Sequence, residues 1–128
     1  MATVLFVCKA NRGRSVMSQA LFERAADGRH HAVSAGSGAV ADGGPHPEVV
    51  EAMRELGIDV AAQQPQRLTT ELAAQADAVV TMGCGDACPV IPGRRYIDWD
   101  LQDPAGQNVE TVREIRNEIE RRVAELPL

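Results

Sequence analysis

The run Thr3-Val-Leu-Phe-Val-Cys8-Lys-Ala-Asn-Arg-Gly-Arg14-Ser15 determines the fold that we expect for this chain. Its first part, from Thr3 to Cys8, is a continuous apolar stretch of strand length, which is typical of a strand buried on both faces of a parallel sheet. From Ser15 the apolar residues recur at three- and four-residue steps until Asp27-Gly28, a pattern that indicates an amphipathic helix. A buried strand followed directly by a helix is the beginning of an α/β unit.

The remaining sequence continues this alternation of strands and helices. We expect further strands over 31–35, 78–82 and 95–99, and further helices over 47–57 and 70–75. The last helix begins either at Asn108 or with the capping-box pattern of Thr111 and Glu114. The alternation predicts an α/β fold with a parallel sheet covered on both faces, and in such sheets ligands bind beyond the carboxyl ends of the strands.

Length and composition indicate a single globular domain and argue against several other classes of protein. The chain has 128 residues and a net charge of -5, which fits one domain over 1–128 that needs no disulfide staples. The acidic balance argues against nonspecific nucleic-acid binding, no apolar run reaches the ~20 residues of a membrane helix, and no secretory signal is visible. Three cysteines, an odd number, do not make a disulfide framework. We therefore expect a cytoplasmic protein with no nucleic-acid or membrane partner.

The loop after the first strand is the candidate oxyanion site. It comprises Lys9, Ala10, Asn11, Arg12, Gly13, Arg14 and Ser15. A loop that passes from a strand end into a helix start directs several backbone N–H groups, backed by the helix dipole, at one point where a tetrahedral anion fits. Cys8 at its base would lose its proton readily, since thiols so placed have pKa values of roughly 3.5–7.5. Arg14 can bind two anion oxygens at once, and Ser15 can hydrogen-bond the thiolate. The alternative is a core cysteine with solvated arginines nearby.

These residues, together with Met17-Ser-Gln-Ala-Leu21 and Ser34-Ala-Gly36, resemble the low-molecular-weight protein tyrosine phosphatase family, and most closely its arsenate reductase branch. The resemblance continues through His46-Pro47, residues 53–59, the Cys84 segment and Asp103-Pro104, so it covers nearly the whole chain. It implies a single flavodoxin-like domain with a four-stranded parallel sheet and helices on both faces. It also implies that Cys8 is the nucleophile, that Arg14 and the loop amides bind the oxyanion, and that arsenate is the substrate, with phosphate or sulfate as mimics.

Transfer of an oxyanion to a thiol also needs a proton donor for the leaving oxygen. The resemblance assigns this general-acid role to Asp103 in Asp103-Pro104. From the residues alone, Asp-Pro is only a turn signal, and Asp86, Asp98 and Asp100 are other acids nearby.

Cys84 and Cys88 lie four positions apart directly after the strand expected over 78–82. On a helix such positions have Cβ atoms about 5–6 Å apart, whereas a disulfide needs roughly 3.5–4.5 Å, so pairing requires a modest adjustment that a segment with Gly83, Gly85 and Pro89 can make. We interpret the pair as a redox dithiol. Two buried core thiols, or half of a zinc site completed by histidines, are the alternatives.

The resemblance implies a relay without metal or organic cofactor. Cys8 attacks arsenate, Cys84 attacks Cys8 and releases arsenite, and Cys88 resolves the disulfide to Cys84–Cys88, which a thioredoxin reduces. The better-known members of the family have a longer spacer between the second and third cysteines than the three residues here. In an alternative branch that uses mycothiol with a glutaredoxin-like partner, Cys84 and Cys88 would be spectators. A tyrosine phosphatase and a noncatalytic oxyanion sensor are the other hypotheses.

Several positions depart from the family pattern. Ala10 and Gly13 stand where relatives often have Gly and Cys, and Gln19 stands where potassium-binding relatives have Glu, so we expect no tight potassium site and no metal. We assign the histidines, His30, His31 and His46, to loops or the surface, and Tyr96 and Trp99 to packing. The first half of the chain has only two aromatic residues, Phe6 and Phe22, which favours a small inorganic oxyanion over phosphotyrosine.

Overall fold

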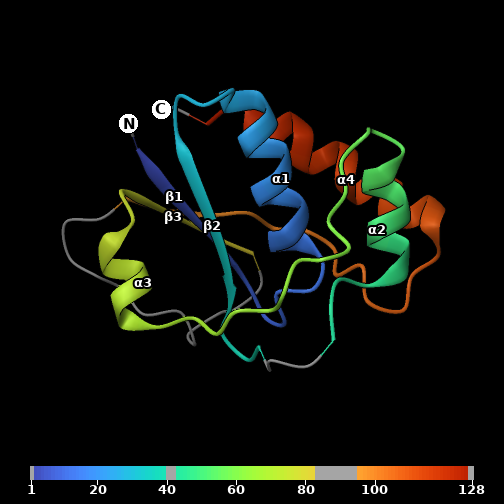
Figure 1. Ribbon diagram of the computed structural model, residues 1–128, viewed down its shortest axis with the longest axis horizontal. Coiled ribbons are helices and arrows are strands. Elements are labelled where there is room, and N and C mark those ends of the chain that lie inside the picture. The colour runs from blue at the N-terminus through green and yellow to red at the C-terminus, as the bar shows by residue number, and fades with distance from the viewer. Residues whose placement is uncertain (1, 40–42, 83–94, 127–128) are drawn as a thin grey trace.

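Four parallel strands form one sheet in the computed structural model, which describes residues 2–39, 43–82 and 95–126 (Figure 1). The strands are β1 (Thr3–Cys8), β2 (His31–Gly36), β3 (Ala78–Thr81) and β4 (Arg95–Asp98), in the order β2-β1-β3-β4. The predicted four-stranded parallel sheet is therefore confirmed. The direction of winding reverses between β1 and β3, and in flavodoxin-like sheets the ligand crevice opens at this point, beyond the carboxyl ends of the strands.

Helices cover both faces of the sheet, as predicted, but unequally. They are α1 (Arg14–Ala26), α2 (Pro47–Arg54), α3 (Thr70–Gln75) and α4 (Val109–Ala124). Figure 1 shows α1, α2 and α4 together on one side of the sheet and the short α3 on the other. The helix expected over 47–57 ends at Arg54, because the amides of Leu56 and Gly57 bond three residues back instead of four.

The central strand β1 separates two hydrophobic cores. Phe6 belongs to the larger core under α1, α2 and α4, where its ring packs against Phe22 at 5.6 Å and Trp99 at 5.9 Å. Leu5 and Val7 point to the opposite face and join the smaller core under α3. Because successive strand residues point to opposite faces and both faces are buried, β1 is a continuous apolar run. The predicted packing role of Trp99 is confirmed.

Helix α4 begins at the first of its two predicted starts, Asn108, and not at the capping-box pattern of Thr111 and Glu114. The Asn108 side chain accepts a hydrogen bond from the Thr111 amide at 2.9 Å, so Asn108 is the N-cap and Val109 the first helical residue. The capping box of Thr111 and Glu114 is wrong, because Thr111 lies within the first turn. Strands β3 and β4 each end one residue earlier than predicted, although the amides of Met82 and Trp99 still bond the neighbouring strands at 2.8 Å.

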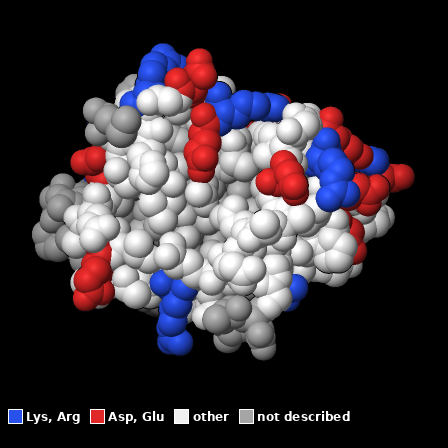
Figure 2. Space-filling view, in the orientation of Figure 1, with Lys and Arg blue, Asp and Glu red and all other residues white. Residues whose placement is uncertain are grey.

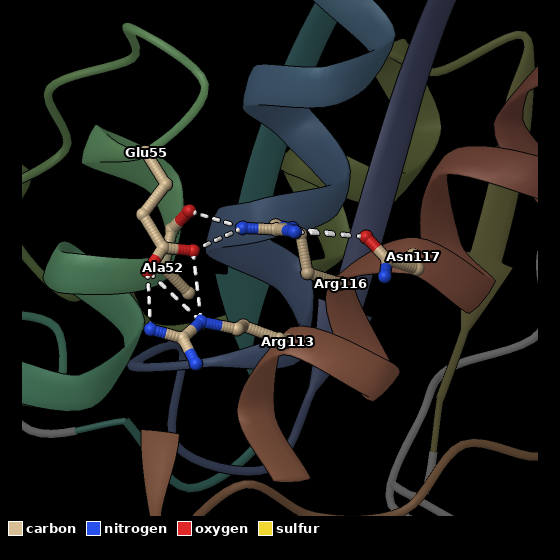
Figure 3. A network of polar contacts seen from close by, with 5 residues as sticks. All are labelled: Ala52, Glu55, Arg113, Arg116 and Asn117. Atoms are coloured by element: carbon tan, nitrogen blue, oxygen red, sulfur yellow. Dashed lines mark hydrogen bonds and ion pairs between the residues drawn. The ribbon is translucent and has the colours of Figure 1, made fainter. Parts of the chain in front are cut away.

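A polar network joins α2 to α4 (Figure 3). Arg116, which is 8% exposed, donates to the Ala52 carbonyl at 2.6 Å and to the Glu55 carboxylate at 2.9 Å. Arg113 donates to both Glu55 oxygens. Hydrogen bonds from Arg113 and Arg116 lower the pKa of Glu55 below its ordinary value, so this carboxylate stays ionised at neutral pH.

The surface shows charges of both signs. On the face drawn in Figure 2, basic and acidic side chains are interspersed along the upper and right-hand margins. Within the described part of the chain, no helix has the length and apolar character needed to cross a membrane.

Candidate active site

The loop after β1 is shaped by a glycine beneath it. Gly36, the last residue of β2, pairs with Cys8, and a Cβ at Gly36 would lie 2.7 Å from the Lys9 carbonyl oxygen and 2.8 Å from the Asn11 nitrogen. Only glycine leaves room for this backbone approach. The Ser37 amide donates to the Cys8 carbonyl at 3.0 Å, which turns that carbonyl away from the inside of the loop.

The amides of the loop are available to a ligand. Among the described residues, none of the N–H groups of 9–13 donates a hydrogen bond. The first amides of α1, which begins at Arg14, also have no partner within the helix. Free N–H groups beside a helix N-terminus are the arrangement that binds tetrahedral anions in proteins.

A chain of hydrogen bonds leads from Gln66 through Asn11 to the Ser15 hydroxyl beside Cys8. The Gln66 amide donates to Asn11 Oδ1 at 2.9 Å, which orients the Asn11 side chain so that its Nδ2 donates to Ser15 Oγ at 2.7 Å. Because Asn11 fills one lone pair of that oxygen, the Ser15 hydrogen is free for Cys8 Sγ, 3.0 Å away. Cys8, Asn11 and Ser15 are all buried. The contact places a hydroxyl that can donate beside the candidate nucleophile.

Asn11 was predicted to be one of the anion-binding residues of the loop, but its side chain is used within the protein, where it bonds Ser15 and Gln66. Its backbone, with a left-handed φ of 56° that Asn tolerates, forms the turn of the loop. Its side chain faces Ser15, so only the backbone N–H of Asn11 remains to bind an anion in the loop.

The structure brings Arg14 and Asp103 together. Arg14 is 8% exposed, and its guanidinium donates to the Leu101 carbonyl at 3.3 Å and lies 3.6 Å from Asp103 Oδ2. The Asp103 side chain is 58% exposed, and its Oδ1 accepts the Ala105 amide at 3.0 Å. The predicted nucleophile, arginine and acid thus share one site, although Asp103 lies far from the other two in the chain.

These groups surround a cavity of about 140 Å³. It is lined by Cys8, Lys9, Ala10, Arg12, Gly13, Arg14, His46, Asp103 and Ala105. Pockets for drug-sized ligands are several times larger, about 300–1,000 Å³. None of these described lining residues is Phe, Tyr or Trp. The cavity therefore has the size and polarity of a site for a small oxyanion.

His46 is a site residue that sequence reasoning missed. It precedes Pro47, the first residue of α2, and its amide donates to the Arg12 carbonyl at 3.1 Å, which places its ring in the cavity wall. Partial burial and then the Arg12 charge lower the pKa of His46, while Asp103 and Glu48 oppose the shift. The ring is therefore neutral at pH 7. Pro at a first helical position was the available signal, since it marks the residue before it as the helix start.

The other two histidines are far from the cavity. His30 accepts a hydrogen bond from the Ala2 amide, and His31 is exposed at the start of β2. Both agree with the prediction of surface or loop positions.

Gln19 is engaged by several side chains, and its Nε2 donates to Glu23 Oε1 at 2.9 Å. Its Oε1 accepts hydrogen bonds from Ser34 Oγ at 2.7 Å and from Gln63 Nε2 at 2.9 Å. Within the described residues, no three His, Cys, Asp or Glu side chains come together as metal ligands.

Cys84 and Cys88, the predicted dithiol, lie outside the described residues, as does Asp86. Of the three cysteines, only Cys8 is placed; it is buried as a free thiol.

A flavodoxin-like sheet with a thiol and an arginine in the loop after its first strand defines a phosphatase-type α/β domain. The chain matches the family described as low molecular weight phosphotyrosine protein phosphatase over residues 3–127, and it belongs to that family.

Individual relatives extend the comparison. A protein from Halobacterium salinarum is 41% identical over 127 residues, covering 94% of this chain and 87% of its own length. The glutaredoxin arsenate reductase of Synechocystis sp. is 32% identical, with 98% and 96% covered. The solved thioredoxin-dependent arsenate reductase of Corynebacterium glutamicum has a TM-score of 0.81 and 37% identity over 98% of this chain, but this chain spans only 58% of that protein.

Proposed function

We propose that this protein is an arsenate reductase that reduces arsenate to arsenite through Cys8. The observation that carries the proposal is the Ser15 hydrogen bond to Cys8 Sγ at the base of a small cavity closed by Arg14 and Asp103. Two relatives named as arsenate reductases support the choice of substrate.

In the first step Cys8 Sγ attacks the arsenic atom and displaces one oxygen. The loop amides and Arg14 hold the other oxygens, where they stabilise the charge of the transition state. Asp103 gives its proton to the departing oxygen, which leaves as water. Arsenic remains pentavalent in the resulting Cys8 adduct, so this step needs no reductant.

Reduction occurs in the second step. Cys84 attacks Cys8 Sγ, the sulfur–arsenic bond breaks, and its electron pair leaves with arsenic as arsenite. The two thiols supply the two electrons and become the Cys8–Cys84 disulfide. Cys88 then forms the Cys84–Cys88 disulfide, frees Cys8, and leaves a disulfide that thioredoxin reduces. The relay proceeds in the cytoplasm, where reduced thiols are maintained, and needs no metal or organic cofactor.

A second reductant class is favoured by a specific observation. The Synechocystis relative is named for glutaredoxin, and the Corynebacterium relative for thioredoxin. In the alternative, a thiol such as mycothiol attacks the Cys8 adduct, a glutaredoxin-like partner completes the cycle, and Cys84 and Cys88 are spectators.

The deciding experiment is arsenate-dependent NADPH oxidation with thioredoxin and its reductase, with arsenite measured directly. We expect turnover that is lost in C8S, C84S and C88S. Normal thioredoxin-coupled turnover in C84S would refute the relay. Turnover only with mycothiol and its partner, unchanged in C84S and C88S, would establish the alternative.

Phosphatase activity is the second candidate function, and the family to which the chain belongs favours it. Rapid hydrolysis of a phosphotyrosine analogue, unaffected by C84S and C88S and without arsenite formation, would replace arsenate reduction with this function. Oxyanion binding without turnover under any of these conditions would identify a sensor.

A further inference from the structure

Gly13 has a proline ring where a side chain would be. It is the N-cap residue of α1, and a Cβ built on it would lie 2.5 Å from Pro104 Cγ and 3.4 Å from Pro104 Cδ. Nonbonded carbon atoms are best separated by about 3.5–4.0 Å, so the first of these distances is a clash. The Pro104 ring is therefore packed on the Cα of Gly13, and in this arrangement a side chain at position 13 would have to displace it.

This position would ordinarily have a different residue. N-caps favour Ser, Thr, Asp and Asn, whose side chains bond the free helix amides. Gly13 makes no such bond, which leaves the first amides of α1 open toward the cavity and leaves space for Pro104.

Pro104 is the neighbour of Asp103, the acid of the proposed mechanism. The turn that follows is closed by the Ala105 amide on Asp103 Oδ1 at 3.0 Å and by the Gln107 amide on the Pro104 carbonyl at 3.0 Å. These bonds make the 103–107 turn one unit, so the place where the Pro104 ring rests also determines the place of the Asp103 carboxyl.

The Arg14–Asp103 contact alone does not fix that carboxyl. It spans 3.6 Å, and although Arg14 is buried, the Asp103 side chain is 58% exposed, so the carboxylate is largely solvated and is held only loosely by this contact. A general acid must be positioned more accurately than this, since a misplacement of about 1 Å can reduce a reaction rate on the order of a hundredfold.

We propose that Gly13 is a positioning residue for the reaction: its bare Cα seats the Pro104 ring and thereby holds Asp103 over the oxygen that leaves when the Cys8 adduct forms. The inference rests on the proposed acid role of Asp103. It concerns the step in which Cys8 sulfur bonds to the central atom, one oxygen departs, and the Asp103 proton leaves with it as water.

This step can be measured without any reductant. Each reversible attack of Cys8 on oxygen-18-labelled inorganic phosphate exchanges one phosphate oxygen with solvent. We expect G13A to reduce the maximal exchange rate by about 10–100-fold, with the phosphate KM changed less than about threefold. Gly38→Ala is the matched control, because a Cβ there would lie at an ordinary 3.6 Å from the same loop; it should exchange at the parent rate.

A compensating variant separates the contact from general damage to the loop. P104A removes Cγ and Cδ, the two ring atoms that a methyl group at position 13 would meet first, so G13A/P104A should exchange within about threefold of P104A alone. A double variant as slow as G13A, or a G13A protein as fast as the parent, would overturn the inference.

D103N separates a failure of the acid role of Asp103 from a failure of the positioning role of Gly13. If D103N exchanges at the parent rate, the acid role and the inference both fail. If D103N is slow but G13A/P104A is not restored, the acid role stands and only the inference about Gly13 fails.

Discussion

Ser15 Oγ lies 3.0 Å from Cys8 Sγ and at the same time accepts a hydrogen bond from Asn11 Nδ2 at 2.7 Å, so its own hydrogen is free for the sulfur. A hydroxyl that donates to a sulfur favours the charged thiolate over the thiol, and it also favours a thiolate that departs from an adduct. The Asn11 side chain is oriented in turn by the backbone amide of Gln66, which lies 55 residues away from Asn11 in the sequence.

Replacement of Ser15 by Ala removes this donor and should slow alkylation of Cys8 by iodoacetamide at pH 7 by about 3–30-fold, in line with one lost charge-assisted hydrogen bond. Mass spectrometry of the Cys8 peptide separates this thiol from the other two. Ser18→Ala is the matched control, since its hydroxyl is buried one turn further along α1 and donates to the Arg14 carbonyl instead. Equal alkylation rates in both variants would mean that the Ser15 bond does not act on the sulfur.

The Arg14–Asp103 contact predicts opposite effects on binding and on rate. D103N keeps the acceptor for the Ala105 amide but removes both the acidic proton and the negative charge beside Arg14. The maximal exchange of labelled phosphate should fall by about 10²–10⁴-fold, the usual contribution of a general acid. Sulfate should bind about two- to fivefold more tightly, a small change because the Asp103 carboxylate is 58% exposed and its charge is screened by solvent. A fall in both rate and sulfate affinity would instead indicate a distorted site.

The strands, the helices and the loop around Cys8 could be predicted from the sequence because each depends mainly on residues that are adjacent in the chain. Thr3–Cys8 is apolar because both faces of β1 are covered locally, and the strand–loop–helix order alone places Cys8 beneath free amides. The contacts that complete the site join distant segments: Gln66 to Asn11, and Pro104 to Gly13. No periodicity indicates such pairs. Asp103 was found only through the family resemblance. His46 was assigned to a loop or the surface, and its place in the cavity wall could not be foreseen because it depends on the bond of its amide to the distant Arg12 carbonyl.

His46 makes sulfate binding depend on pH. Its pKa lies below the ordinary value of 6.5, so the ring is neutral at pH 7 and gains a proton only as the pH falls through the lowered pKa. Protonation adds a positive charge to the cavity wall, beside Arg12 and near Asp103 and Glu48. We therefore expect sulfate, which stays a dianion throughout, to bind more tightly at pH 5 than at pH 7, and H46Q to lose that increment.

The same shift has a consequence for stability. Below pH 6.5 the unfolded chain takes up a proton at His46 more readily than the folded protein does, so the free energy of unfolding falls as the pH falls through this range. H46Q should therefore lose less stability between pH 7 and pH 5 than the parent in urea denaturation. H31Q, which removes an exposed histidine, is the control. An acid loss in H46Q equal to that in H31Q and the parent would contradict the assignment.

Arg116 should be the most important polar residue for the packing of α2 against α4. In Figure 3 its guanidinium lies between the two helices, where it donates to the Ala52 carbonyl at 2.6 Å and to Glu55 at 2.9 Å. R116M keeps the apolar stem but leaves the buried Ala52 carbonyl without this donor, which should lower the free energy of unfolding by about 1–3 kcal/mol. Arg121→Met provides the comparison on the same helix, because the Arg121 side chain is 60% exposed and pairs with Glu118 and Glu125 at the surface. Its removal should leave the urea midpoint close to that of the parent. If R116M and R121M shift the midpoint equally, the Ala52 contact adds nothing beyond an ordinary surface ion pair.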